Sequence, residues 1–166
     1  MNYFKAEAEI QLRPFCVGDK AAIEKWPSYP AEFGELDYAL RKDGWIDEFC
    51  DQSDARLFAV EQSSELIAFT VLALTAPTEA EFRIALRGDK AGQGLGRIIT
   101  DNTLAIGFNE IGLERIHLIV RKNNPRAIGL YRKIKFVSCG ECRKTVNNKP
   151  AAFLMMSILK NDFLGS

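Results

Sequence analysis

The sequence predicts an α/β (α+β) domain, in which about four helices flank a mixed central sheet of about seven strands. Two observations support this class. Short β-rich runs alternate with amphipathic segments in the order β-α-α-β-β-β-α-β-α-β-β. A glycine-rich turn at residues 91–96 also separates a strand-like run from a helix-like run. With 166 residues, we expect residues 1–166 to form a single domain with a substantial core.

Seven runs predict strands, because apolar and polar residues alternate in them or β-branched and aromatic residues cluster. We expect strands at residues 8–15, 56–61, 66–75, 80–87, 115–121, 137–142 and 151–159. The second and third strands flank a turn at residues 62–65, so they predict a hairpin.

Four segments predict helices from the spacing of their apolar residues and from terminal signals. We expect helices at residues 18–26, 33–50, 95–111 and 125–133. Gly44 weakens the second segment, which can be two short helices. Gly112 stands where a glycine ends a helix, and Asn124 followed by Pro125 is a typical helix start.

Charge and hydropathy exclude several classes of partner. Lys+Arg and Asp+Glu balance at 22 each, so we expect no nucleic-acid partner. The first residues, Met1 to Glu9, carry no apolar run typical of a secretory signal. The longest apolar run, Leu66 to Ala76, is too short to cross a bilayer. We therefore expect a cytoplasmic protein without membrane contact.

The four cysteines predict reduced thiols, as is usual in the cytoplasm. Cys139 and Cys142 have C-x-x-C spacing, but there is no second such pair and His117 is the only histidine. A zinc site would lack ligands, so no metal is expected. A redox pair remains an alternative to two ordinary strand residues.

The turn Ala91-Gly92-Gln93-Gly94-Leu95-Gly96 is the strongest functional signal. Glycine lets the backbone approach a ligand closely, and the first turn of a helix offers N–H groups that suit a phosphate. The spacing matches neither the dinucleotide fingerprint nor the mononucleotide P-loop. The turn therefore predicts a diphosphate site, and the alternative is a turn that only joins a strand to a helix.

Three segments in series carry a family resemblance. Residues 82–86 read Phe-Arg-Ile-Ala-Leu, residues 92–97 read Gly-Gln-Gly-Leu-Gly-Arg, and residues 124–136 read Asn-Pro-Arg-Ala-Ile-Gly-Leu-Tyr-Arg-Lys-Ile-Lys-Phe. They resemble the strand, the [Q/R]-x-x-G-x-[G/A] pyrophosphate loop and the N-x-x-A-x-x-L-Y-x-x-x-G-F segment of the GNAT superfamily of N-acetyltransferases. Ala91 and Lys135 depart from the usual Gln or Arg and the usual Gly.

The resemblance implies the GNAT fold, with splayed strands that form an acyl-CoA cleft. It implies acetyl-CoA as cosubstrate, no metal, and direct acetyl transfer in a ternary complex to a primary amine. The acceptor would be a protein N-terminus or a small-molecule amine, and the overall style is similar to the ribosomal-protein-alanine N-acetyltransferase branch. A homodimer is a possible assembly, because many relatives dimerise.

The resemblance also implies cofactor-binding residues. Backbone N–H groups around the turn would hold the pyrophosphate, the strand before it would pair with pantetheine, and Asn124 would bond to pantetheine. The expected cofactor-binding residues are Ile84, Ala85, Leu86, Gly92, Gln93, Gly94, Leu95, Gly96, Arg97, Asn124 and Tyr131. The cleft would open where the strand at residues 80–87 parts from the strand at residues 117–120.

Two residues are the expected catalytic groups. Tyr131 lies two helical turns after Asn124, so both face one side, and its phenol can protonate the leaving thiolate. Some relatives carry a glutamate base at the position of Ile119. Isoleucine cannot act as a base, so the base must be sought elsewhere. Glu81, on the strand before the glycine turn, is the first candidate, Glu79 is the second and His117 is the third. A further alternative is that the reaction needs no side-chain base.

The acceptor is expected to contact aromatic residues before the first hairpin, although these can equally be core residues. They are Trp26, Tyr29, Phe33, Tyr38 and Trp45. An alternative function is a non-catalytic acyl-CoA-binding module or sensor, which would keep the glycine turn but would not need Tyr131.

Overall fold

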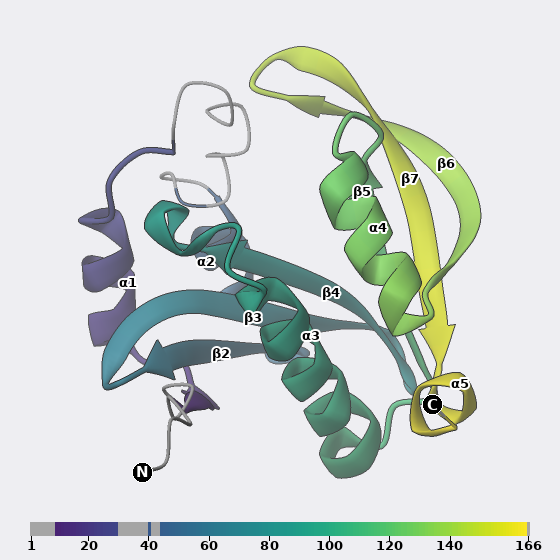
Figure 1. Cartoon of the computed structure of the whole chain (residues 1–166), viewed down its shortest axis with the longest axis horizontal. Helices are drawn as coiled ribbons and strands as arrows, with labels where there is room; N and C mark the ends of the chain where they lie inside the picture. Colours follow the sequence, from purple (N-terminus) through teal and green to yellow (C-terminus); the bar gives the residue numbers. More distant parts are fainter. Residues whose placement is uncertain (1–8, 30–39, 41–43, 166) are drawn as a thin grey trace, which may run out of the picture.

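A computed structural model describes residues 9–29, 40 and 44–165. Its centre is one seven-stranded mixed sheet in the order β1-β2-β3-β4-β5-β7-β6 (Figure 1). The strands are β1 (Ile10–Pro14), β2 (Ala55–Gln62), β3 (Glu65–Ala76), β4 (Glu79–Leu86), β5 (Arg115–Arg121), β6 (Val137–Val146) and β7 (Lys149–Leu159). The helices are α1 (Val17–Glu24), α2 (Trp45–Phe49), α3 (Leu95–Ala105), α4 (Pro125–Ile134) and α5 (Lys160–Leu164), with a 3₁₀ turn η2 (Gly88–Lys90) and a π-helical turn η3 (Ile106–Ile111).

The predicted class and strand number are confirmed, and the predicted hairpin joins β2 and β3 as an antiparallel pair. The last two strands are longer than predicted. β6 and β7 continue as an antiparallel pair through residues 143–150, around Asn147 and Asn148. These two residues have φ values of 52° and 63°, which asparagine tolerates in tight hairpin turns.

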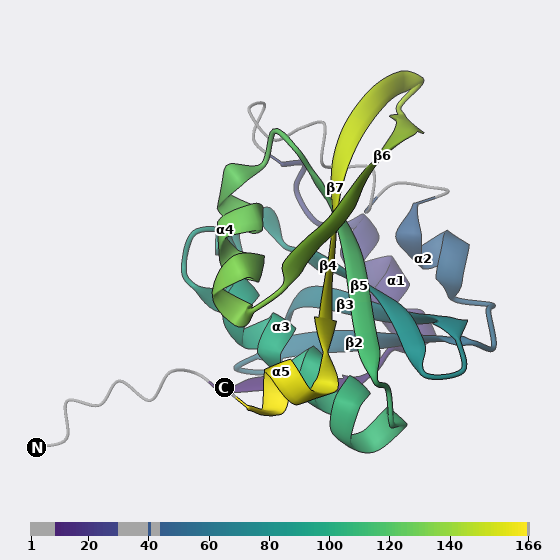
Figure 2. The same cartoon turned by 90° about the vertical axis from the view of Figure 1, so that its right-hand side faces the viewer.

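Helices cover both faces of the sheet (Figure 2). One face carries α3, α4 and α5, and its core includes Phe82, Leu104, Phe108 and Tyr131. The other face carries α1 and α2, whose apolar residues pack with Phe69 and neighbouring strand residues. Two buried layers therefore sandwich the sheet, as expected for this class.

Two predicted helices differ in detail from the structure. The helix predicted at 95–111 is α-helical to Ala105, continues as the π-helical turn η3, and ends before Gly112 as predicted. Of the helix predicted at 33–50, the described part is α2, which begins after Gly44. Residues 33–39 and 41–43 lie outside the described residues. The short elements η2 and α5 were not predicted.

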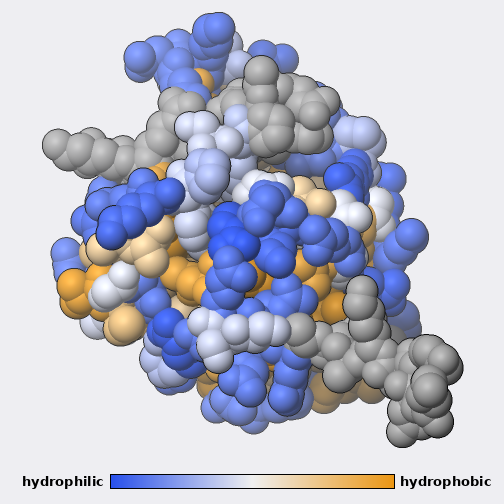
Figure 3. All heavy atoms as spheres, turned by 60° about the vertical axis from the view of Figure 1, so that its left-hand side comes forward, coloured by the Kyte–Doolittle hydropathy of each residue, from blue (hydrophilic) through white to orange (hydrophobic). Residues whose placement is uncertain are grey.

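The surface is largely hydrophilic on the side drawn in Figure 3, where hydrophobic residues are visible in the gaps between charged and polar ones. Among the described helices, none combines the length and the apolar character that crossing a membrane would require.

The feature that positions the site is a break in the middle of the sheet. β4 and β5 run parallel, but they pair only between residues 79–81 and 115–117. Beyond Glu81 and His117 the two strands separate, and Figure 1 shows them diverging beside α4. The sequence predicted this separation from the family resemblance.

Candidate active site

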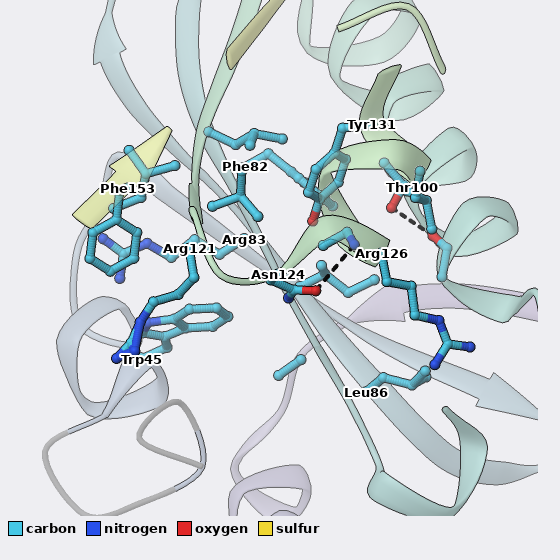
Figure 4. A pocket seen from close by; sticks show the side chains of 18 of the residues that line it. Trp45, Phe82, Arg83, Leu86, Thr100, Arg121, Asn124, Arg126, Tyr131 and Phe153 are labelled. Atoms are coloured by element: carbon cyan, nitrogen blue, oxygen red, sulfur yellow. Dashed lines mark hydrogen bonds between the residues drawn. The ribbon is translucent and has the colours of Figure 1, made fainter. Parts of the chain in front are cut away.

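A cavity of about 820 Å³ lies where β4 and β5 separate. Residues of β4, β5, α2, α4, the turn before α3 and the β6–β7 hairpin line it. Figure 4 shows Leu86 and Arg126 toward one side of this cavity and Trp45, Arg121 and Phe153 toward the other, with Asn124 and Tyr131 between them. The cavity therefore connects the glycine turn to the α2 side of the sheet.

The glycine turn forms one end of this cavity. Gly92 and Gly94 have φ values of +79° and +78°, a conformation that costs other residues about 1–2 kcal/mol. Gly94 is the residue immediately before α3, so the unpaired N–H groups of the first helical turn follow it directly. These positive φ values explain why glycine stands at both positions.

The predicted phosphate-binding residues divide into two groups. Gly92, Gly94 and Gly96 line the cavity. Of the others, Gln93 donates a side-chain hydrogen bond to the Asp89 carbonyl at 3.1 Å, Leu95 is buried in the core, and Arg97 is exposed. None of these three residues is among those that line the cavity, and the prediction that their backbone N–H groups hold the phosphate stays a prediction.

Arg126 is a cavity residue that the sequence reasoning missed. It follows Pro125 in the first turn of α4 and lines the cavity. Its guanidinium lies close to the glycine turn, because a Cβ on Gly92 would stand 2.9 Å from Nη2 of Arg126. A guanidinium forms paired hydrogen bonds to phosphate oxygens, so Arg126 adds a positive charge where a diphosphate would lie.

Asn124 has the predicted place at the start of α4. Its side-chain oxygen accepts a hydrogen bond from the backbone N–H of Ala127 at 3.2 Å, which caps the helix. Asn124 also lines the cavity, together with Ile84, Ala85 and Leu86 of the separated part of β4. The capping role is therefore present in the structure, and the role toward pantetheine stays a prediction.

The Leu86 carbonyl already has a protein partner. The Tyr29 hydroxyl donates a hydrogen bond to it at 2.7 Å, and Tyr29 itself lines the cavity. A carbonyl oxygen has two lone pairs, so Leu86 can accept a second hydrogen bond from a ligand. The segment before residue 30 is thereby tied to the end of β4.

Tyr131 reaches the cavity from α4. Its side chain is 9% exposed and lies edge-on to Phe136, with ring centroids 5.5 Å apart. Figure 4 shows its hydroxyl directed toward the end of α4 where Asn124 lies. The phenol thus stands within the part of the cavity that links the two ends, which is the placement the predicted acid requires.

The three predicted bases are not among the residues that line the cavity. Glu81 binds Nε of Arg83 at 2.7 Å, and Glu79 pairs with Arg115 at 3.3 Å. His117 shares a hydrogen bond of 2.9 Å with Thr75, and burial, helped by the charge of Arg115, lowers its pKa. The structure therefore places none of them against the cavity, and their role as bases stays a prediction.

Glu48 of α2 is the carboxylate that does line the cavity among the described residues. Its Oε2 accepts a hydrogen bond from Nη1 of Arg83 at 2.9 Å. The sequence reasoning missed Glu48, because nothing local in the segment 45–49 marks this side chain as different from its exposed neighbours.

The aromatic residues predicted for the acceptor have different places. Tyr29 and Trp45 line the cavity, whereas Trp26 packs against the core on the α1–α2 face. Phe33 and Tyr38 lie outside the described residues. The β6–β7 hairpin contributes residues 144–147 to the same end, and Arg121 lies over the Phe153 ring at 5.7 Å.

Within the described residues, no three His, Cys, Asp or Glu side chains gather closely enough to hold a metal ion. Cys139 and Cys142 are both free thiols on β6. Among the described residues, the cavity therefore offers hydrogen-bond donors, the phenols of Tyr29 and Tyr131 and the carboxylate of Glu48, a set suited to acyl transfer by positioning and proton movement.

The comparison with known families agrees with the fold and with the geometry of the cavity. The acetyltransferase (GNAT) family matches residues 20–136, which include all three sequence segments described above. The chain belongs to this family.

Spermidine N(1)-acetyltransferase of Escherichia coli (strain K12) is 30% identical over 118 residues, which cover 69% of this chain. The matched part spans only 63% of the length of that relative. A spermidine N(1)-acetyltransferase of Vibrio cholerae is 30% identical over 87 residues, which cover 51% of this chain and 50% of that one.

Among solved structures, spermidine N-acetyltransferase from Vibrio cholerae in complex with CoA and spermine has a TM-score of 0.77. It is 23% identical and the alignment covers 93% of this chain and 98% of that chain. This likeness confirms the predicted GNAT fold. The relatives named here carry the name of a polyamine rather than of a protein N-terminus.

Proposed function

We propose that this protein is an N-acetyltransferase that transfers the acetyl group of acetyl-CoA to a primary amine of a small molecule. The proposal rests chiefly on the cavity between β4 and β5, which joins a glycine turn, a phenol and a carboxylate in one space. Membership of the GNAT family supports acetyl-CoA as the donor. The transfer is direct, which is consistent with the described lining of the cavity, where no cysteine stands that could carry the acetyl group.

The donor binds along the α3–α4 side of the cavity. Backbone N–H groups of residues 92–97, with Arg126 beside them, hold the pyrophosphate. Pantetheine extends along Ile84–Leu86, on the edge of β4 that is no longer paired with β5. Asn124 completes this contact through the NH₂ group that its capping role leaves unused.

The reaction itself requires a neutral amine and a stabilised leaving group. The amine nitrogen attacks the thioester carbon, the C–N bond forms, and the C–S bond breaks. Tyr131 donates a proton to the departing CoA thiolate, because its hydroxyl lies between the donor end and the acceptor end. One proton lost by the amine thus ends on the thiol, and a second is released to water.

The acceptor enters from the α2 side, past Trp45 and the β6–β7 hairpin. A polyamine is the first acceptor to test, because the relatives described above are named for spermidine. A protein N-terminus remains a second candidate from the sequence. We further propose that residues 1–166 act as one domain, in the cytoplasm, without metal, membrane or nucleic acid, and that the protein forms a homodimer, which light scattering would test.

The decisive experiment separates catalysis from mere binding. Calorimetry measures the affinity for acetyl-CoA, and thiol release measures turnover with spermidine, spermine, an amino sugar and an alanine-terminated peptide. An acyl-CoA sensor would bind acetyl-CoA but release no CoA above the hydrolysis rate with any amine, and that result would exclude our proposal.

Tyr131→Phe tests the proposed acid. Removing the hydroxyl keeps the ring against Phe136, so we expect unchanged acetyl-CoA affinity and a fall in kcat of roughly 100-fold. The sensor alternative predicts no turnover to lose. A variant as active as the wild type would show that another group protonates the thiolate.

A further inference from the structure

Glu48 lies at the end of the cavity opposite the glycine turn. Its side chain is hydrogen-bonded to Arg83 of β4, the strand that separates from β5. Arg83 is the second residue of β4 after Glu81, the last residue that pairs with β5. Glu48 binds Arg83 directly, so its carboxylate lies beside the point where β4 and β5 part. The proposed function places pantetheine along Ile84–Leu86, the residues of β4 that follow this point.

The Arg83 guanidinium contacts four side chains, two aromatic rings and two carboxylates. Its guanidinium lies 5.3 Å from the Trp45 ring centroid and 4.7 Å from that of Phe49, and it donates hydrogen bonds to Glu48 and to Glu81. Trp45, Glu48 and Phe49 are spaced i, i+3 and i+4, so they share one face of α2. This arrangement docks α2 on β4 and fixes the direction of the Glu48 side chain.

The hydrogen bonds leave Glu48 with unused capacity. Only Oε2 of Glu48 binds Arg83, and its Oε1 has no hydrogen-bond partner among the described residues. The Glu48 side chain is 45% exposed, whereas Arg83 and Glu81 are 15% and 18% exposed. Glu81 therefore lies behind Arg83, while Glu48 faces the cavity and water.

We propose that Glu48 binds the ammonium group of the acceptor through Oε1 and takes its first proton. Arg83 and Glu81 act as positioning residues, with Glu81 holding the guanidinium from behind. This inference rests on the proposed function and names the carboxylate that the sequence could not identify. It assigns Glu81, the first candidate base, a supporting rather than a direct role.

Both protons that the acceptor nitrogen loses are accounted for without any further reactant. The acceptor arrives as R–NH₃⁺, and Glu48 takes one proton and passes it to water at the exposed mouth of the cavity. The neutral amine attacks the thioester carbon, the C–S bond breaks, and a second proton from nitrogen reaches the CoA thiolate by way of Tyr131. The products are the amide, CoA and one proton in solution.

The test compares Glu48→Gln with Glu81→Gln and with Glu110→Gln, an exposed glutamate of η3 that lies outside the cavity. Glutamine keeps the size and a hydrogen bond but removes the charge. For Glu48→Gln we expect the KM for spermidine to rise and kcat/KM to fall, the latter roughly 10- to 100-fold, with the acetyl-CoA affinity unchanged. Glu81→Gln should lower kcat/KM only a few-fold, because Arg83 keeps its contacts with α2, and Glu110→Gln should match the wild type.

Arg83 variants test the positioning role. Arg83→Gln removes both ion pairs and should reproduce most of the rise in KM, whereas Arg83→Lys, which keeps the charge, should recover part of it. A purely structural role for Arg83 would lower thermal stability without this split between KM and kcat, and that result would overturn the positioning role.

Two outcomes separate this inference from the proposed function. If the wild type acetylates spermidine or another amine and Glu48→Gln is as active, the proposed function stands and the role of Glu48 is excluded. If the wild type releases no CoA with any amine, the proposed function fails. Calorimetry of spermidine binding to the CoA complex then decides the role of Glu48, because equal affinity in wild type and Glu48→Gln would overturn it.

Discussion

Lys135 ends α4 in a conformation that suits glycine better than lysine. Its φ is +92°, and its backbone N–H bonds to the carbonyls of Tyr131 and Arg132. Glycine can take this conformation without the Cβ clash that costs other residues about 1–2 kcal/mol. Lys135 is also exposed, so its side chain contributes little packing. The family pattern has glycine at this position, and the structure shows the physical reason.

We therefore expect Lys135→Gly to stabilise the protein. The relief of about 1–2 kcal/mol is partly offset by about 0.5–1 kcal/mol, because glycine has more freedom in the unfolded chain. The net gain in the free energy of unfolding should be about 0.5–1 kcal/mol. For a chain of this size, that corresponds to a rise in Tm of roughly 1–4 °C.

Differential scanning fluorimetry and urea unfolding measure this gain, and Lys133→Gly is a matched control. Lys133 is exposed too, but it lies within α4, where glycine should cost about 1 kcal/mol. The same substitution two residues apart should thus change stability in opposite directions. Loss of stability in both variants would refute the argument that the left-handed conformation of Lys135 is strained.

Three further predictions concern the glycine turn, α4 and the first helix. Gly92→Ala should weaken acetyl-CoA binding about 5- to 10-fold in calorimetry, because its φ of +79° disfavours alanine and the added Cβ would push against Arg126. Gly129→Ala should raise Tm with unchanged acetyl-CoA affinity, since a Cβ there meets no atom within 4 Å and alanine favours the helix by about 1 kcal/mol. Asp19 accepts hydrogen bonds from Arg13, which lower its pKa from 3.8 to about 2. The ionised Asp19 contributes fully to the free energy of unfolding above 3.8, the pKa of an aspartate in the unfolded chain, and this contribution is lost as the pH falls toward 2. Asp19→Asn should therefore lower the free energy of unfolding by about 2 kcal/mol at pH 7 and by little at pH 2, as measured by urea unfolding.

Contrary results would be informative for each. Unchanged acetyl-CoA affinity in Gly92→Ala would show that the turn does not hold the donor. A lower Tm for Gly129→Ala would point to a neighbour that the structure does not place there. An unfolding penalty for Asp19→Asn that stays constant from pH 7 to pH 2 would show that packing, rather than charge, explains the role of Asp19.

Structural features that depend on a few neighbouring residues, such as helix starts and turns, could be predicted from the sequence. The start of α4 follows from Asn124 and Pro125, and the turn before α3 follows from its glycines, because capping and positive φ depend on neighbouring residues. The length of the β6–β7 hairpin was missed. Most β6 residues are exposed on both sides of the strand, so the alternation that marks a half-buried strand is absent.

The candidate base shows where sequence reasoning ends. Glu81 stands on the strand next to the glycine turn, and the sequence favoured it for that reason. Glu48 and Arg83 are 35 residues apart, and only the folded chain reveals that Arg83 binds both glutamates and turns one of them toward the cavity. The same holds for Arg126, whose approach to Gly92 depends on how α4 packs beside α3.

The two ends of the cavity differ in how closely their residues follow one another along the chain. The proposed donor end depends on backbone geometry at residues 92–97 and 124–131, which lie within the part of the chain that the family model matches. The proposed acceptor end is lined by α2, by Arg83 and Arg121, and by a hairpin of exposed residues, which are distant from one another in sequence. Substitutions there leave the sheet and the glycine turn intact. Donor chemistry should therefore transfer between relatives more faithfully than acceptor identity, and the amine panel matters more than the name of any one relative.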